Sequence, residues 1–188
     1  MKKELRVVGI EDAPFDKFDP LQKYVRIVAT LYRGGDFMDG LLSCYVEKDG
    51  EDATLKIIEM INDCKFKPQI QAIFLKGIAV AGFNVINPQV LHKETKIPVI
   101  IVIRDYPDYK KIYAALDSIG MQKKKDIIKK MPKPVKIKDI YVQHVGINLE
   151  DTKELLRITC TRSNVPEAIR VAHLIASGIS DGQSRGRA

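Results

Sequence analysis

Cysteine is scarce in this sequence. Its three cysteines, Cys44, Cys64 and Cys160, are odd in number and widely spaced, and they form no CxxC pair. A disulfide framework or a cysteine zinc site needs paired or closely spaced thiols. The pattern therefore favours reduced, buried cysteines and a cytoplasmic protein.

Long apolar runs are also missing. No segment approaches the roughly 20 apolar residues that a membrane-spanning helix needs. The opening residues MKKE are not followed by the apolar stretch of a signal peptide. We therefore expect no membrane partner. A chain of 188 residues with 45% apolar content can bury a substantial core as one domain over residues 1–188.

Several motifs for chemistry are absent too. The sequence contains neither GxGxxG nor GxxxxGK[ST], the glycine-rich patterns that cradle phosphates. Ser43, Ser163 and Cys160 have no base nearby in the sequence, so we identify no nucleophile triad. Acidic and basic side chains at the ends of predicted strands remain as the candidates.

Strands and helices are predicted to alternate along most of the chain. Runs of apolar and β-branched residues indicate strands, and apolar residues at helical spacing after a capping residue or proline indicate helices. Three strands precede the alternation, which predicts a mixed α/β sheet with helices on both faces. The predicted strands are 5–10, 24–32, 37–47, 69–75, 97–103 and 139–145; helices begin near 52, 88, 107, 148 and 166, and a loose tail covers about 178–188.

The first strand organises the candidate site, because it ends in Glu11 and Asp12. Open α/β sheets place their chemistry at the carboxyl ends of strands. A right-handed crossover makes the fourth strand parallel to the first, so Lys76 ends at the same edge, where the helix at Asp52 also begins. Topology thus gathers Glu11, Asp12, Asp52 and Lys76 at one edge, where two or three carboxylates would offer the oxygen ligands that Mg²⁺ or Mn²⁺ takes. A polar turn after the strand is the alternative, since turns favour Asp.

Lysines are concentrated in one stretch. Residues 121–138 contain eight lysines and one acid. In a chain of net charge +7, this stretch is a candidate electrostatic arm for DNA or RNA. A solvated lysine-rich helix and linker is an equally open alternative. The lysines that we select as candidate contacts are Lys123, Lys124, Lys125 and Lys129.

A resemblance to a known family rests on five segments: GIEDAPF, DGEDAT, GIAVAGFNV, NVPEAIRVAHLIASGIS and SRGRA. They resemble the archaeal family called domain of unknown function 99. That family in turn resembles endonuclease V, which cleaves nucleic acid near deaminated adenine (inosine). The resemblance covers nearly the whole chain, and it implies a ribonuclease H-like fold and a nucleic-acid partner.

The same resemblance implies roles for individual residues. Glu11 occupies the position of the first catalytic Asp of endonuclease V, and Asp52 falls approximately on its second metal ligand. Phe37 replaces a strand-separating wedge tyrosine, and Arg104 replaces a lysine that contacts phosphate. Lys76 departs from the pattern, because both families usually have an Asp before the glycine at this point.

The three histidines are assigned less directly. His144 lies close to a functional histidine of endonuclease V, but about two residues out of register. His173 follows Ile169 by four residues in an apolar helix, so we interpret it as a core histidine. His92 is predicted to lie on the surface.

Two functions follow from these residues. In the favoured one, the protein binds nucleic acid, and a degraded site with Lys76 holds no metal tightly and cleaves little or nothing. The alternative is a metal-dependent endonuclease acting on deaminated or otherwise altered DNA or RNA. There Glu11, Asp12 and Asp52 would hold one metal ion, and Lys76 would replace a second cation.

Overall fold

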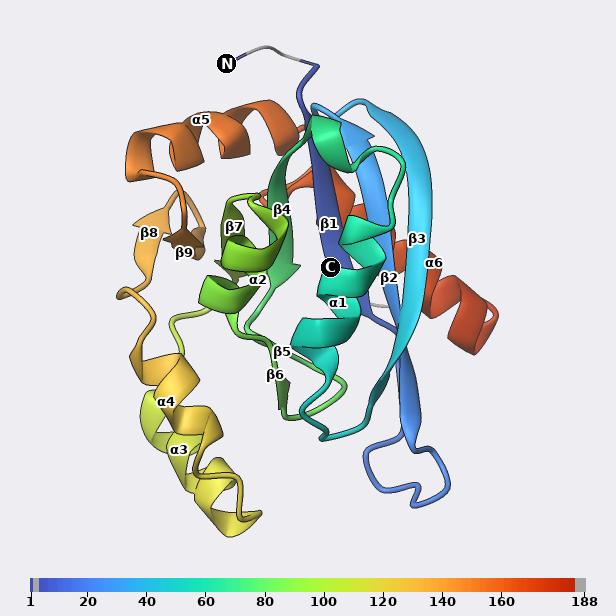
Figure 1. Cartoon of the computed structure of the whole chain (residues 1–188), viewed down its shortest axis with the longest axis vertical. Helices are drawn as coiled ribbons and strands as arrows, with labels where there is room; N and C mark the ends of the chain where they lie inside the picture. Colours follow the sequence, from blue (N-terminus) through green and yellow to red (C-terminus); the bar gives the residue numbers. More distant parts are fainter. Residues whose placement is uncertain (2–3, 185–188) are drawn as a thin grey trace.

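The computed structural model describes Met1 and residues 4–184, and its centre is a seven-stranded sheet (Figure 1). The strands follow the order β3-β2-β1-β4-β7-β9-β8. Their bounds are β1 Arg6–Asp12, β2 Tyr24–Arg33, β3 Phe37–Glu47, β4 Ile70–Lys76, β7 Val99–Ile103, β8 Val135–Ile137 and β9 Ile140–Val145. A separate small hairpin consists of β5 Ala79–Val80 and β6 Asn84–Val85.

Six α-helices accompany the sheet in the described part of the chain. They are α1 Ala53–Asn62, α2 Pro88–Thr95, α3 Tyr109–Ser118, α4 Lys124–Lys129, α5 Leu149–Thr159 and α6 Glu167–Asp181, with a 3₁₀ turn at Lys67–Gln69. Asn87 and Asn148 cap α2 and α5, since each side chain accepts a hydrogen bond from a backbone N–H of the first turn. No helix among the described residues is long and apolar enough to cross a membrane.

Strand directions bring three carboxyl ends to one edge of the sheet. β1, β4 and β7 run parallel to one another, whereas β2 and β9 pair antiparallel with β1 and β7. The ends of β1, β4 and β7 therefore lie together, at the lower edge in Figure 1, near the β5–β6 hairpin. The predicted mixed sheet is confirmed.

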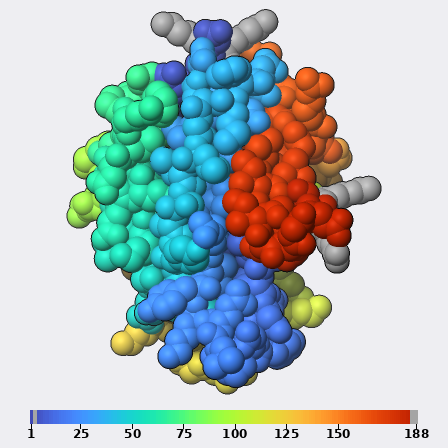
Figure 2. All heavy atoms as spheres, turned by 90° about the vertical axis from the view of Figure 1, so that its right-hand side faces the viewer, coloured from blue at the N-terminus to red at the C-terminus, as the bar shows by residue number. Residues whose placement is uncertain are grey.

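Helices cover both faces of this sheet, as the sequence predicts. Side chains alternate along β1, so that Val8 and Ile10 pack with α1 and α2, while Val7 packs with α5 and α6. Gly9 allows α6 to approach closely, because a Cβ there would lie 2.3 Å from the backbone carbonyl carbon of Ala168. Figure 2 faces the outer strand β3, with α6 beside it and residues of the β1–β2 loop below.

The structure differs from the predicted elements in four places. The loop after β4 contains the β5–β6 hairpin, and the lysine-rich stretch contains α4, because Ile128 of α4 packs against Leu116 and Val85. β8 adds an outer strand beyond β9. The last helix continues to Asp181, past the predicted start of the loose tail at about 178, since Ser177 is still buried. Residues 185–188 of that tail lie outside the described residues.

Candidate functional site

Glu11 is the centre of a cluster of ionisable side chains at the end of β1. Its side chain is buried, with 6% of the residue exposed. The Lys76 ammonium donates to Glu11 Oε1 at 2.8 Å, and His173 Nδ1 of α6 lies 3.5 Å from the same oxygen. The register Ile10↔Leu75 between β1 and β4 brings Lys76 to this place, so its predicted position beside Glu11 is confirmed.

Burial dominates the electrostatics of this cluster. It raises the pKa of Glu11 from an ordinary 4.5 to about 7, although Lys76 lowers this pKa; Asp12 raises it further, and Arg104 has a smaller lowering effect. A carboxyl group with such a pKa exchanges its proton near neutral pH. Glu11 is thus suited to accept or donate a proton as well as to pair with a cation.

Asp12 has a different environment, although it follows Glu11 directly. Its Oδ2 accepts a hydrogen bond of 2.7 Å from the backbone N–H of Ala81, in the turn of the β5–β6 hairpin. Successive side chains of a strand point to opposite faces. Glu11 accordingly meets Lys76 and α6, while Asp12 meets the hairpin. Burial also raises the pKa of Asp12, against the effect of the Ala81 hydrogen bond.

Asp52 stabilises the connection between β3 and α1 through hydrogen bonds. Its Oδ1 accepts hydrogen bonds from the backbone N–H of Glu47 at 3.0 Å and from Asn84 Nδ2 at 2.7 Å. The fully buried Asn84 also donates to the Glu47 carbonyl and accepts from the Ala53 N–H. Asp52 therefore binds two protein donors on the hairpin side of the sheet.

A metal centre formed by the three predicted ligands does not fit this arrangement. Glu11 pairs with Lys76, Asp12 with a backbone N–H, and Asp52 with Glu47 and Asn84. Among the described residues, no group of three or more Asp, Glu, His or Cys side chains is placed to hold a metal ion. The reason is the strand geometry, which sends Glu11 and Asp12 to opposite faces.

Lys124 corrects a second prediction, because it is buried rather than available to nucleic acid. Only 4% of it is exposed. Its ammonium donates to the carbonyl oxygens of Asp49 at 3.0 Å, Gly50 at 2.7 Å and Phe83 at 2.7 Å. The Asp49 carboxylate in turn accepts from the Phe83 N–H at 2.8 Å. Lys124 thus ties α4 to the hairpin and to the loop that precedes α1.

Of the other predicted nucleic-acid contacts, some are exposed and one forms an ion pair. Arg104 is exposed directly after β7, and its charge acts on Glu11. Lys123 and Lys129 are exposed on and beside α4, whereas Lys125 forms an ion pair with Asp117. Arg104 and the exposed lysines stay candidates for phosphate contacts.

Phe37 lies at the wrong end of the sheet for a wedge beside Glu11. It is 57% exposed and its ring lies 4.8 Å from the Arg33 guanidinium carbon. Phe37 pairs with Arg33, which pairs with Arg6 at the start of β1. Six residues of β1 therefore separate its level from Asp12, a distance of about 20 Å at the usual rise per residue.

His173 is the site residue that sequence reasoning missed. Its apolar helix suggested a core residue, whereas α6 presents it to Glu11. The available signal in the sequence was Gly9, a glycine inside a strand two residues before Glu11, because such a glycine often marks a close backbone approach. His144 does not join the cluster: its Nδ1 lies 2.7 Å from the Ile147 carbonyl oxygen, and its strand partner is Ile100. His92 is half-buried rather than on the surface, with Nδ1 2.9 Å from the Ile97 carbonyl oxygen.

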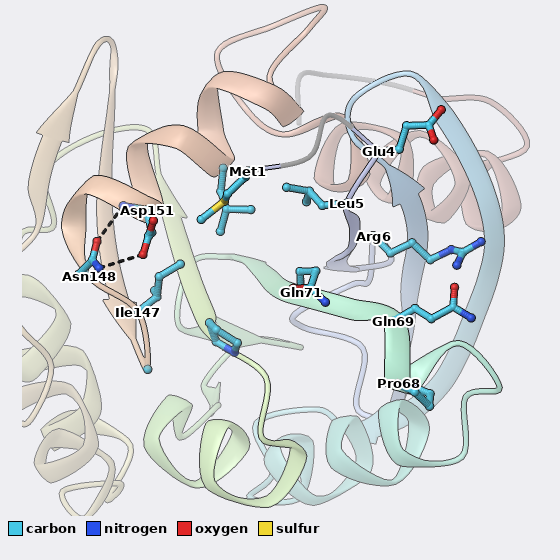
Figure 3. A pocket seen from close by; sticks show the side chains of 13 residues that line it. Met1, Glu4, Leu5, Arg6, Pro68, Gln69, Gln71, Ile147, Asn148 and Asp151 are labelled. Carbon is cyan, nitrogen blue, oxygen red and sulfur yellow. Dashed lines mark hydrogen bonds between the residues drawn. The ribbon is translucent and has the colours of Figure 1, made fainter.

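Two cavities differ in their relation to this cluster. An apolar cavity of about 280 Å³ adjoins the strand ends and is lined by Gly77, Phe83, Ile103 and Tyr109, among others. A larger, open hollow of about 1050 Å³ lies at the opposite edge, around the first residues of β1 and β4 (Figure 3). The Asn148–Asp151 hydrogen bonds lie at its border. None of the clustered ionisable residues lines either of these two cavities, but Gly77 directly follows Lys76, so the smaller cavity is the nearer of the two to the cluster and the better candidate for ligand binding.

Comparison with known proteins identifies the family of the chain. The family model described as Endonuclease dU matches residues 3–180. The chain belongs to the Endonuclease dU family. UPF0215 proteins of Methanosarcina barkeri and Methanocaldococcus jannaschii are 45% and 39% identical to it; the matches cover 100% and 95% of this chain and 97% and 96% of theirs.

Solved structures show the fold of this Endonuclease dU family member. An Archaeoglobus fulgidus protein of unknown function matches with a TM-score of 0.85 and 34% identity, over 93% of this chain and 97% of the other. Endonuclease V of Streptomyces avermitilis matches with a TM-score of 0.58 and 12% identity, over 91% and 79%. Ciona intestinalis endonuclease V, in complex with an inosine-containing DNA, gives 0.55 and 12%, over 89% and 82%.

These matches confirm the resemblance that the sequence segments indicated. The Endonuclease dU family member has archaeal relatives and an endonuclease V-like, ribonuclease H-like fold. At 12% identity, the endonuclease V structures show the fold alone. The roles of Glu11, Asp12, Asp52 and Lys76 must therefore be argued from their own surroundings.

Proposed function

We propose that this protein binds nucleic acid at the edge where β1, β4 and β7 end, and that it performs little or no metal-dependent cleavage. The observation that carries this proposal is the 2.8 Å contact between Lys76 and the buried Glu11. An ammonium group already supplies the positive charge that a divalent cation would bring to this carboxylate. A metal ion would have to displace it and would then meet one acid on this face of the sheet.

Nucleic acid is the partner that the surroundings of this edge support. The family is described as an endonuclease, and an endonuclease V of the same fold is in complex with DNA. Arg104 is exposed directly after β7 and its charge acts on Glu11, and α4 with its exposed Lys123 and Lys129 lies near the hairpin, at the lower left of Figure 1. Lysine and arginine side chains in such positions bind phosphates, with an affinity that falls as salt rises.

Cleavage of deaminated or otherwise altered DNA or RNA is the second candidate function. It is favoured by the family description and by the proximity of His173 to Glu11, whose pKa is about 7. These two groups are suited to move a proton at a phosphodiester. The adjoining apolar cavity of about 280 Å³ would receive an unstacked base.

The deciding experiment combines metal binding with a nicking assay. Calorimetric titration of Mn²⁺ is expected to give no measurable heat of binding with the natural protein and measurable binding with Lys76→Asp. That substitution removes the ammonium and adds a second carboxylate on the face of the sheet that carries Glu11 and His173. Lys76→Met is the matched control, because it removes the ammonium without adding an oxygen ligand.

The nicking assay uses strands with one deoxyuridine, one inosine or neither, with and without Mn²⁺. The proposal expects the natural protein to bind these strands and to leave them intact. Tight Mn²⁺ binding and Mn²⁺-dependent nicking by the natural protein would establish the second candidate function instead.

A further inference from the structure

Four tyrosines form a connected row beside the proposed nucleic-acid site. The ring centroid of Tyr141 lies 5.3 Å from that of Tyr106, Tyr106 lies 6.2 Å from Tyr109, and Tyr109 lies 6.0 Å from Tyr113. Tyr141 belongs to β9, Tyr106 to the loop after β7, and the other two to α3. We call these four residues the tyrosine row.

Packing explains only part of this row. Tyr109 and Tyr113 pack at the margin of the small apolar cluster around Leu116 and Ile128, which holds α3 against α4 and the hairpin. Tyr106 is 53% exposed, and its ring is held edge-on by Tyr109 and Tyr141. An aromatic ring that is fixed by its neighbours and still open to solvent can stack on a flat ligand at little cost in conformational entropy.

Cations flank both ends of the tyrosine row. Lys136 Nζ lies 5.9 Å from the Tyr141 ring centroid, and Lys125 and Lys129 lie 5.8 and 5.9 Å from that of Tyr113. Residues 104–139 contain eleven basic and five acidic side chains, and so carry most of the net charge of +7. Two of the acids form ion pairs with lysines of the same segment, Asp108 with Lys111 and Asp117 with Lys125. Fixed aromatic rings among lysines match bases joined by phosphates.

The row also continues the edge at which Glu11 lies. Tyr106 follows Arg104 by two residues, and the Arg104 charge acts on Glu11. Tyr141 is the strand partner of Ile103, the last residue of β7. From there, α3 carries Tyr109 and Tyr113 away from the sheet, at the lower left of Figure 1. A strand with a phosphate at Arg104 can therefore extend over the tyrosine row.

We propose that the tyrosine row binds single-stranded nucleic acid by base stacking and so extends the site at Glu11. This inference rests on the proposed function, because it names the form of nucleic acid that the same edge accepts. A duplex does not meet the requirement, since its bases are already stacked on one another. Stacking uses the face of any base, so DNA and RNA strands share the chemistry that the row recognises.

A single tryptophan provides the direct test, because the natural chain contains none. Tyr106→Trp keeps a stacking ring at the exposed position and adds the only tryptophan fluorescence. Titration with an oligothymidine and an oligouridine of twelve nucleotides is expected to quench this fluorescence, whereas a blunt hairpin duplex is expected to quench it much less. Tyr24→Trp is the matched control, because Tyr24 is 56% exposed on β2 and should show no quenching.

Affinities measured by fluorescence anisotropy complete the test. Tyr106→Ala is expected to weaken binding of labelled oligothymidine and oligouridine by about tenfold or more, while Tyr24→Ala leaves it unchanged. If Tyr106→Ala binds both strands as well as the natural protein does, the tyrosine row is not the contact, although nucleic-acid binding at the edge would stand. If the natural protein binds none of the oligonucleotides, the proposed function itself fails.

Discussion

Glu11 and Asp12 are adjacent in β1, yet they meet opposite environments. Glu11 lies among side chains that carry or exchange charge, namely Lys76, His173 and, further away, Arg104. Asp12 lies against backbone, because its carboxylate accepts from the Ala81 N–H. The difference teaches that one face of this strand end gathers side chains that can carry charge, while the other face holds the hairpin in place.

The hairpin side is held in place by polar side chains. From the sequence alone, these side chains could be predicted to have a functional role. Asp52, Asn84 and Lys124 all form buried or half-buried hydrogen bonds between the β3–α1 connection and the hairpin. On the Glu11 side, Lys76 and His173 approach the Glu11 carboxylate through their side chains. Substitutions should therefore alter charge and pH behaviour on the Glu11 side, and rigidity on the Asp12 side.

The largest expected effect concerns the charge of Glu11. Because its pKa is raised to about 7 in the folded protein, the folded state holds this proton more tightly than the unfolded chain does. The corresponding stability is present below about pH 4.5, the ordinary pKa, and is lost as the pH rises through 7. The difference is on the order of 3 kcal/mol at full ionisation.

Glu11→Gln removes this dependence, and urea unfolding at pH 5 and pH 8 measures it. We expect the natural protein to lose more stability than Glu11→Gln between these two pH values, by roughly 2 to 3 kcal/mol. Groups other than Glu11 titrate in both proteins, so the difference between them isolates Glu11. An equal loss in the two proteins would mean that Glu11 titrates like an exposed carboxyl.

The second-largest expected effect concerns Lys124, on the hairpin side of the sheet. Lys124→Met leaves the carbonyls of Asp49, Gly50 and Phe83 without their donor. We expect a loss of about 2 kcal/mol in the free energy of unfolding, and faster hydrogen exchange at the Ala81 amide, which bonds to Asp12. Its exposed neighbour supplies the control, since Lys123→Met should change stability by less than about 0.5 kcal/mol. Similar values for both variants would show that Lys124 does not fasten the hairpin.

The fold could be predicted further from the sequence than the site could. Apolar runs and capping residues report local structure, so the six long strands and most helices fall close to their predicted places. The pairing of Lys76 with Glu11 also followed from strand order. Strand order decides which edge a residue reaches, but not which face its side chain takes, and for this reason the sequence groups Asp12 and Asp52 with Glu11.

Other errors have similar physical causes. Lys124 looks like its neighbours in the lysine-rich stretch, because sequence alone does not show which lysine finds three carbonyls. His173 looks apolar in context, because the helix that carries it lies against the strand end. Both misreadings concern a single polar side chain in an otherwise regular pattern. Its contacts come from chain segments far away in the sequence.

The smallest expected effect concerns Phe37, and it sharpens the comparison by testing a position outside both regions. Phe37 is exposed at the β2–β3 turn, at the edge opposite Glu11. Phe37→Ala should therefore change the free energy of unfolding by less than about 0.5 kcal/mol. It should also leave the affinity for an inosine-containing strand within about twofold, since it removes no phosphate or base contact of the proposed site. Thermal unfolding and anisotropy titrations measure the two quantities. A tenfold loss of affinity would extend the nucleic-acid path along the whole length of β1, and would restore the wedge role that the resemblance to endonuclease V implied.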